Sequence, residues 1–318
     1  MNFTTSKHLQ IFRLLTFIWL NLFAFGSVFG QSYILDIARD SARSDTRTGG
    51  VIEKTDFKAG GSDVKLSVNV PAFQMTFWQG GKEVKNYPVG VGLKEYPIFV
   101  GIRNIKHIIW NPIWIPPASD WVAPALQGQI IEPTDPRNPL GKIKIPLGYG
   151  YLIHQAKGTQ DLGNLVSHGC VRVLQNDLYD LNEKIVSAFL LDVSNDEISN
   201  AKRTKETFVI ELENELPIEV TYDTLVVEAG NLHIYPDVYG YNKNTVENLR
   251  RELKANGIDE TKISDAILEK MLARALNKSQ YIISLKQIRD GIYLDGKTVS
   301  VIEQNAKSNK GKRRGKKR

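Results

Sequence analysis

The chain has 318 residues, of which 42% are hydrophobic and 24% charged, a composition that excludes disorder throughout and is typical of a folded globular protein. Its formal net charge of +6 is carried by the two ends: residues 1–30 contain two basic side chains, residues 307–318 contain eight, and neither stretch contains an acidic one. Subtracting those charges leaves residues 31–306 at about −4, which argues against nucleic acid as a partner. Cys170 is the only cysteine, which excludes an intrachain disulfide and any multi-cysteine metal site.

Residues 1–30 predict a secretory signal peptide. A basic start leads into an apolar run that ends in small residues, among them Ser27 and Gly30. The alternative is an uncleaved membrane anchor, although the apolar run is on the short side for a bilayer span. We expect cleavage after Gly30 and therefore an exported protein that works in the periplasm or cell wall. Residues 31–61, which mix Asp, Arg, Ser, Thr and Gly, predict a short leader or linker.

Residues 62–195 predict a mainly β domain. Two apolar runs flank Gly80 and Gly81, a pattern typical of a β-hairpin with these glycines at its tip. Clusters of proline and glycine separate the later runs, which favours antiparallel strands over βαβ units. The proline-rich segment 111–121 predicts a long loop, and the apolar spacing of residues 175–185 predicts a short helix.

The rest of the chain divides into three predicted parts. Residues 196–240 read as a β extension of the preceding domain, with strands over 208–212 and 218–227. Residues 241–305 predict a small α/β region of unassigned role. Its expected elements are a helix that ends before Gly257, a second helix over 261–276 and a final pair of strands. Residues 306–318 predict a disordered basic tail, which either binds anionic wall polymers or a membrane surface, or has no partner.

One segment carries the chemistry. His154 ends an apolar strand, and fourteen residues later His168 stands in the run Ser-His-Gly-Cys-Val-Arg, residues 167–172. A thiol attacks carbonyls as the thiolate, so Cys170 needs a nearby base or positive field to react at neutral pH. Gly169 permits a turn whose backbone N–H groups can point at a developing oxyanion. The alternative is that Cys170 is a small buried side chain without a catalytic role.

The run from His154 to SHGCVR resembles the signature of the YkuD-type L,D-transpeptidases, bacterial enzymes that crosslink peptidoglycan through an active-site cysteine. The similarity covers residues 64–240: the segment NPIWIPP resembles a loop of the family, and NPLGKIKIPLGYGYLIH resembles the run into its catalytic histidine. The resemblance implies a YkuD-like antiparallel β-sandwich catalytic domain with short helices.

The resemblance also implies roles for individual residues. Cys170 resembles the nucleophile that attacks the third stem residue, expels the terminal D-amino acid and keeps the donor as a thioester. His154 resembles the base, and the backbone amides of His168, Gly169 and Cys170 are candidates for the oxyanion hole. Candidates for substrate binding are Arg172, Ser167, Gln155, Tyr149 and Trp114. For Arg172, a structural salt bridge is equally expected, and Trp110, Trp114 and Trp121 either line the substrate groove or pack in the core.

The expected function is therefore L,D-transpeptidation on peptidoglycan stem peptides, without a cofactor or metal. Carbapenem-type β-lactams are expected to acylate Cys170. Two alternatives stay open from the sequence. The first is an L,D-carboxypeptidase or amide hydrolase on the same scaffold, in which water replaces the acceptor amine. The second is a non-catalytic wall-binding protein that keeps the fold.

Overall fold

The structure is a computed structural model that describes residues 34–36, 38–39, 63–276 and 278–302. The predicted signal peptide, most of the predicted leader and the predicted basic tail lie outside the described residues. Within the described part of the chain, no helix has both the length and the apolar character that crossing a membrane requires.

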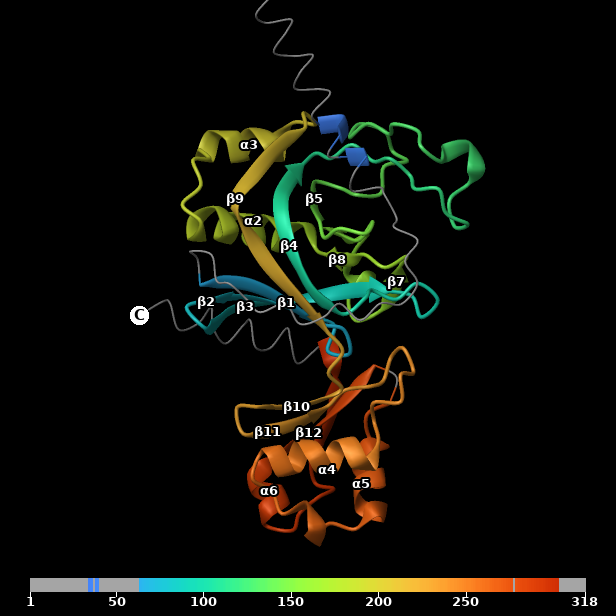
Figure 1. The fold of residues 1–318 in the computed structure, drawn as a ribbon, viewed down its shortest axis with the longest axis vertical. Helices are drawn as coiled ribbons and strands as arrows, with labels where there is room; N and C mark the ends of the chain where they lie inside the picture. The colour runs from blue at the N-terminus through green and yellow to red at the C-terminus, as the bar shows by residue number, and fades with distance from the viewer. Residues whose placement is uncertain (1–33, 37, 40–62, 277, 303–318) are drawn as a thin grey trace, which may run out of the picture.

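The first body of the molecule is a β-barrel (Figure 1). Its strands are β1 (Val64–Asn69), β2 (Gln74–Gln79), β3 (Lys82–Gly92), β4 (Gly101–Trp110), β5 (Ile143–Pro146), β6 (Leu152–Gln155), β8 (Val171–Val173) and β9 (Phe208–Thr221). They follow the order β2-β1-β9-β4-β5-β6-β8-β3, and β3 pairs back with β2 to close the ring. Strand β7 (Leu165–Ser167) pairs with β3 outside the ring. The mainly β prediction is confirmed. The sheet that was expected to form a sandwich is instead one closed barrel.

Most neighbouring strands in the barrel are antiparallel, as expected from the proline and glycine clusters. Three pairs differ, because β1–β9, β3–β7 and β6–β8 run parallel. Parallel neighbours require a long connection between them, and these pairs are indeed joined through intervening segments rather than tight turns. The parallel β6–β8 pair places the strand that contains His154 next to the strand that begins directly after Cys170.

Alternating side chains fill the barrel. In β1, Val64, Leu66 and Val68 are buried, whereas Lys65 between them is exposed. Helix α2 (Gln175–Ala188) begins close to where the sequence predicts it and packs its apolar face on the barrel core. Helix α3 (Asn195–Arg203), which the sequence reading did not include, begins at a capping box formed by Ser194 and Glu197.

Strand β9 differs from the two strands predicted over 208–212 and 218–227. It is continuous from Phe208 to Thr221, and the chain breaks only afterwards, before β10 (Leu225–Glu228). It pairs with β4 along most of its length but with β1 only from Ile218 onward. Pro217 therefore falls where one edge of β9 has no ladder partner, and a proline is tolerated at such a position.

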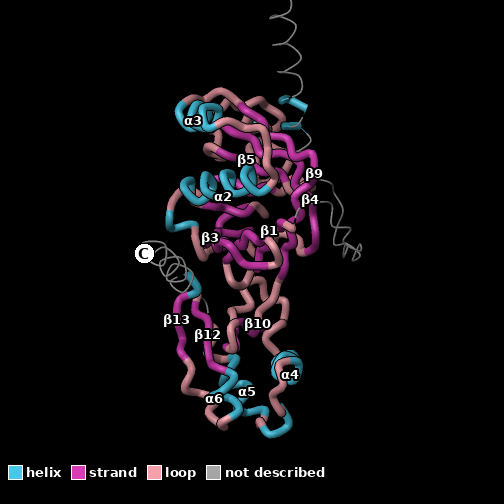
Figure 2. The backbone as a smooth tube through the Cα atoms, turned by 90° about the vertical axis from the view of Figure 1, so that its left-hand side faces the viewer, coloured by secondary structure: helices cyan, strands magenta, loops and turns pink. Residues whose placement is uncertain are grey.

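The second body lies at the far end of the molecule and has its own apolar core (Figures 1 and 2). It is a sheet in the order β10-β11-β12-β13, with helices packed against it. Its further elements are β11 (Asn231–Ile234), α4 (Val246–Ala255), η3 (Glu260–Lys262), α5 (Asp265–Leu272), β12 (Ser279–Ser284), α6 (Leu285–Arg289) and β13 (Lys297–Ser300). The predicted α4 is confirmed and the strand pair is present. The helix expected over 261–276 is shorter, and α6 was not predicted.

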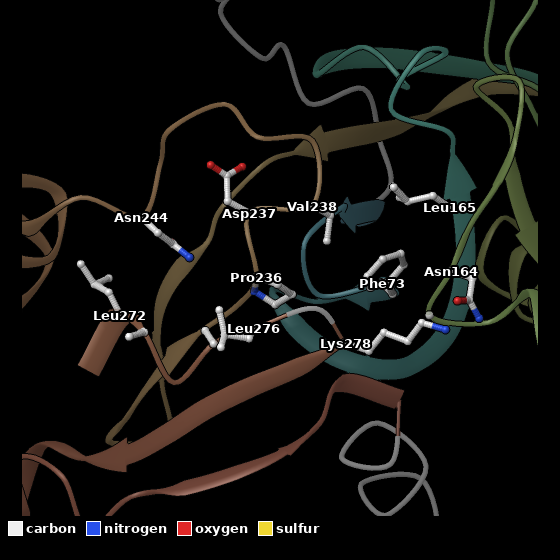
Figure 3. Close-up of a pocket in the computed structure, with 13 residues that line it drawn as sticks. Phe73, Asn164, Leu165, Pro236, Asp237, Val238, Asn244, Leu272, Leu276 and Lys278 are labelled. Carbon is white, nitrogen blue, oxygen red and sulfur yellow. The ribbon is translucent and has the colours of Figure 1, made fainter. Parts of the chain in front are cut away.

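The end of the second body returns to the barrel. Val301 is 1% exposed and belongs to the barrel core, and the side chain of Ile302 packs over Gly163. A cavity of about 750 Å³ lies between the two bodies (Figure 3). Its walls include Phe73, Asn164 and Leu165 from the barrel and Asn244, Leu272 and Leu276 from the second body. Neither Cys170 nor His154 lines this cavity, so it is separate from the site described next.

Candidate active site

The parallel pairing of β6 with β8 brings the two predicted catalytic residues together. Ile153 pairs with Val171 and His154 with Arg172, and Cys170 immediately precedes β8. Ile153 and Val171 are fully buried in the barrel core. Because side chains alternate along a strand, His154 and Arg172 face the opposite side of the sheet. On that side, His154, Cys170 and Arg172 line one cavity of about 370 Å³.

A long loop covers this cavity. We call residues 111–142, which connect β4 to β5, the cover loop; it projects at the upper right of Figure 1. Trp114 and Trp121 of the cover loop line the cavity, and Trp114 is fixed by a β-bridge to Ile131. Ala38, from the short described N-terminal segment, also lines the cavity and is 4% exposed. The predicted long loop is therefore present and forms one wall of the site.

Two hydrogen bonds hold the turn that precedes Cys170. The Ser167 hydroxyl donates a hydrogen bond to the Cys170 carbonyl oxygen at 2.6 Å, and the Leu93 N–H donates to the Ser167 carbonyl oxygen at 2.8 Å. Gly169 has a φ of 104°, and a Cβ at this position would stand 2.3 Å from a ring carbon of Tyr151. Only glycine fits both the backbone conformation and the space.

Burial shifts the Cys170 thiol and the His154 imidazole toward their neutral forms. Burial raises the pKa of Cys170 to about 11, although the backbone of Leu152 and the charge of Arg172 act in the opposite direction. Burial lowers the pKa of His154 to about 4, and Arg172 lowers it further. The buried His154 Nδ1 has no hydrogen-bond partner among the residues that the structure describes. Burial therefore favours the neutral thiol and the neutral imidazole over a thiolate–imidazolium pair.

His168 has a different position from His154. Its side chain is exposed and stacks on Trp121, with ring centroids 4.3 Å apart. The centroid of the Tyr96 ring lies 4.6 Å from that of His168. Partial burial lowers the pKa of His168 as well. The ring of His168 thus connects the turn that precedes Cys170 to the cover loop.

The remaining predicted substrate residues divide into two groups. Trp114, Tyr149 and Ser167 line the cavity, and Tyr149 is 51% exposed there. Gln155 does not line it, because its side-chain oxygen accepts a hydrogen bond from the Lys142 N–H at 3.0 Å. The substrate roles of these residues stay predictions. Trp121 also lines the cavity, whereas Trp110 does not.

Arg172 forms the structural salt bridge that was one of its two expected roles. Its Nη1 lies 3.0 Å from Oδ2 of Asp161, and both side chains are largely buried. Trp110 is likewise structural, since it is fully buried and its indole N–H donates to Asn182 at 3.2 Å.

Asp161 and Tyr151 are the site residues that sequence reasoning missed. No sequence pattern marks Asp161, whereas Tyr151 stands in the GYGYLIH run that leads into His154.

Lys144 extends the row of basic side chains next to the site. It pairs with His154 across β5 and β6, is 3% exposed, and burial lowers its pKa to about 8.

Among the described residues, His, Cys, Asp and Glu side chains form no group that could hold a metal ion. The chemistry that the described groups offer is nucleophilic attack by sulfur with proton transfer to imidazole.

Comparison with known proteins identifies the domain that carries this site. Residues 63–204 match the family model described as YkuD, the L,D-transpeptidase catalytic domain. This confirms the resemblance stated from the His154 to Arg172 segment, and it makes the chain a distant homologue of the L,D-transpeptidases.

The individual relatives are distant and matched only in part. The probable L,D-transpeptidase ErfK/SrfK of Salmonella typhimurium is 29% identical over 118 residues, which cover 36% of this chain and 38% of that protein. The probable L,D-transpeptidase YcfS of Escherichia coli K12 is 25% identical over 167 residues, covering 50% of this chain and 52% of that protein. The chain thus spans about half or less of the length of these relatives. The solved catalytic domain of the Enterococcus faecium L,D-transpeptidase is 15% identical, with a TM-score of 0.33, over 51% of this chain and 98% of that one.

Proposed function

We propose that this protein is an L,D-transpeptidase that acts on peptidoglycan stem peptides through a thioester on Cys170. One observation carries the proposal: β6 and β8 lie side by side and present His154 and Cys170 to a single cavity, inside a YkuD-type domain. A non-catalytic wall-binding protein would have no need of a buried base next to a lone thiol.

The first half-reaction forms the acyl-enzyme. His154 takes the thiol proton as the sulfur attacks the carbonyl carbon of the third stem residue. The carbonyl oxygen becomes an oxyanion, and we propose that the backbone N–H groups of His168, Gly169 and Cys170 stabilise it. When the tetrahedral species collapses, the C–N bond breaks, the leaving nitrogen takes the proton from His154, and the terminal D-amino acid departs. The donor stays bound to Cys170 as a thioester.

The second half-reaction releases the donor. An acceptor amine, which we propose is the side-chain amine of a diamino acid on a neighbouring stem, attacks the thioester carbonyl. His154 accepts a proton from the attacking nitrogen and returns it to the sulfur as the C–S bond breaks. A new amide joins the two stems, and the thiol and imidazole recover their resting states.

The cavity suits a peptide that carries carboxylates. Trp114, Trp121 and Tyr149 give the cavity apolar contact area, and Lys157 and Arg172, which line the same cavity, are basic. Because Arg172 already pairs with Asp161, the exposed Lys157 is the better candidate to meet a stem carboxylate.

The competing proposal with the most support is a hydrolase on the same scaffold. It shares the acyl-enzyme and differs only in the acceptor, since water attacks the thioester and the product is a shortened stem. The Cys170 and His154 geometry serves both reactions equally, so the products have to decide between them.

The test is incubation of the protein without residues 1–30 with purified tetrapeptide-stem muropeptides, followed by chromatography and mass spectrometry of the products. Crosslinked dimers that have lost one terminal D-amino acid support the transpeptidase. Tripeptide stems without dimers replace it with the hydrolase. Unchanged substrate, with a Cys170→Ala control that behaves identically, contradicts both enzymatic proposals.

The site of action is proposed from the sequence of residues 1–30, whose basic start, apolar run and small residues are typical of a signal peptide. We accordingly place the enzyme outside the cytoplasmic membrane, where its substrate lies. N-terminal sequencing of the protein from cell fractions tests this: a mature protein that begins at Gln31 in the periplasm or wall supports export, and intact protein in the cytoplasm contradicts it.

A further inference from the structure

Asp161 is a buried carboxylate beside the active site. It is 5% exposed, and its Oδ2 accepts two hydrogen bonds, one from Nη1 of Arg172 at 3.0 Å and one from the Lys157 N–H at 2.8 Å. Bonds in which donor and acceptor are both charged are stronger than neutral ones, and burial of both partners protects this pair from solvent screening.

The position of this salt bridge in the chain links the two catalytic residues. Asp161 ends the short helix η2 (Thr159–Asp161), in the segment that leaves the strand of His154. Arg172 lies two residues after Cys170 and is the direct neighbour of His154 across β6 and β8. The Asp161–Arg172 bond thus ties the segment that follows the base to the strand that follows the nucleophile.

The backbone fixes where the carboxylate can be. A Cβ on Gly90 would lie 2.4 Å from the Asp161 carbonyl oxygen, so the Asp161 main chain sits directly over β3 at this glycine. Gly90 is the residue that pairs with Arg172 across β3 and β8. The contact of the Asp161 backbone with β3 fixes the position of the Asp161 carboxylate without any help from Arg172. The carboxylate in turn holds the Arg172 guanidinium.

The same guanidinium acts on both reacting groups. Arg172 lowers the pKa of Cys170 and that of His154, while Asp161 has the opposite effect on His154. Other titratable groups that border the cavity or these two residues come from each neighbouring segment: Lys144 on β5, Tyr151 beside β6, Lys157 after it, His168 on the catalytic turn, and Asp120 and Arg137 on the cover loop. Among these, Asp161 is the acid that contacts Arg172 directly.

We infer that Asp161 is a positioning residue of this active site, which holds and partly neutralises the Arg172 guanidinium so that its charge acts on Cys170 and His154 from one fixed place. The inference rests on the proposed function for its relevance to catalysis. It makes a separate physical claim, namely that Asp161 acts on the thiol only through Arg172.

The test measures the rate of Cys170 alkylation by iodoacetamide against pH, which follows the thiolate fraction and requires no transpeptidase activity. Asp161→Asn leaves the guanidinium without its counter-charge, so the pH midpoint of alkylation should fall by about one unit, and the reaction at pH 8 should become about tenfold faster. Arg172→Gln should shift the midpoint upward. The double variant should match Arg172→Gln alone.

A matched control is Glu183→Gln, which removes the acid from the exposed pair that Glu183 forms with Lys202 at 2.6 Å, away from the cavity. It should leave the alkylation profile unchanged. A folded Asp161→Asn variant with the wild-type midpoint overturns the inference, as does a double variant whose midpoint differs from that of Arg172→Gln. If Asp161→Asn alone fails to fold, the comparison of the double variant with Arg172→Gln decides. Failure of the muropeptide test would instead reject the proposed function and leave the alkylation result standing.

Discussion

Trp121 stacks on His168, with ring centroids 4.3 Å apart and ring planes inclined by 13°. Tyr96 contacts the same histidine at 4.6 Å and reaches the Asp120 carboxylate with its hydroxyl. The cover loop is therefore attached to the catalytic turn through the ring of His168. The cover loop and the turn that precedes Cys170 are therefore packed against each other.

His168→Ala should loosen the cover loop, whereas His168→Phe should keep it in place. An aromatic pair contributes about 0.5–1.5 kcal/mol beyond its burial, so its loss should speed opening of the loop by about tenfold at most. Hydrogen exchange of the amides in residues 111–142 measures this opening. Equal exchange in the alanine variant and the wild type, or loss of protection in the phenylalanine variant, would show that stacking does not hold the loop.

Gly169→Ala should abolish acylation of Cys170 and lower the free energy of unfolding. The variant would require a φ of 104° in a residue with a Cβ, and that Cβ would stand 2.3 Å from Tyr151; such backbone strain costs about 1–3 kcal/mol before the clash is counted. The matched control is Gly81→Ala at the tip of the hairpin, where φ is 66° and nothing lies within 4 Å. It should lose about 1 kcal/mol and keep full reactivity. Equal effects of the two substitutions, measured by denaturation and by acylation, would contradict the proposed geometry of the turn.

The buried neutral imidazole predicts a loss of stability in acid. His154 has a folded-state pKa of about 4, below its ordinary value of 6.5, so on acidification the unfolded chain takes up this proton first. The stabilisation of the folded state by the neutral His154 imidazole is fully present above pH 6.5 and is lost as the pH falls toward 4. The loss should be on the order of 3 kcal/mol.

Urea denaturation at pH 7 and pH 4 measures this loss, with His154→Gln as the comparison. The wild type should lose more stability than the variant over this interval, since the variant has no imidazole to protonate. A variant that loses as much as the wild type would place the acid sensitivity in other groups.

Much of the secondary structure could be predicted because many of its elements follow local rules. The hairpin at Gly80 and Gly81, helix α2 and helix α4 follow from turn glycines and apolar spacing. Helices α3 and α6 were missed although both begin with capping boxes, Ser194 with Glu197 and Ser284 with Gln287, which the sequence does display. The continuity of β9 was hidden by its acidic middle and by Pro217, which read as a break between two strands.

The nucleophile and base could be proposed from sequence because a lone thiol beside histidines, glycine and arginine is an unusual set. Their surroundings could not. The Asp161–Arg172 pair depends on η2 folding back over Gly90, and the stack of Trp121 on His168 depends on a loop that begins far earlier in the chain. The shift of Cys170 and His154 toward their neutral forms follows from burial, which only the packed structure reveals.

The central claim is that Cys170, assisted by His154, forms an acyl-enzyme. The most direct measurement is intact-protein mass spectrometry after incubation with a carbapenem, followed by peptide mapping, on the wild type, Cys170→Ala and His154→Gln. The account predicts one adduct per chain, located on Cys170, no adduct on the folded Cys170→Ala variant, and adduct formation at least tenfold slower in His154→Gln. A folded wild type that takes up no carbapenem, or an adduct that persists in Cys170→Ala, would contradict it.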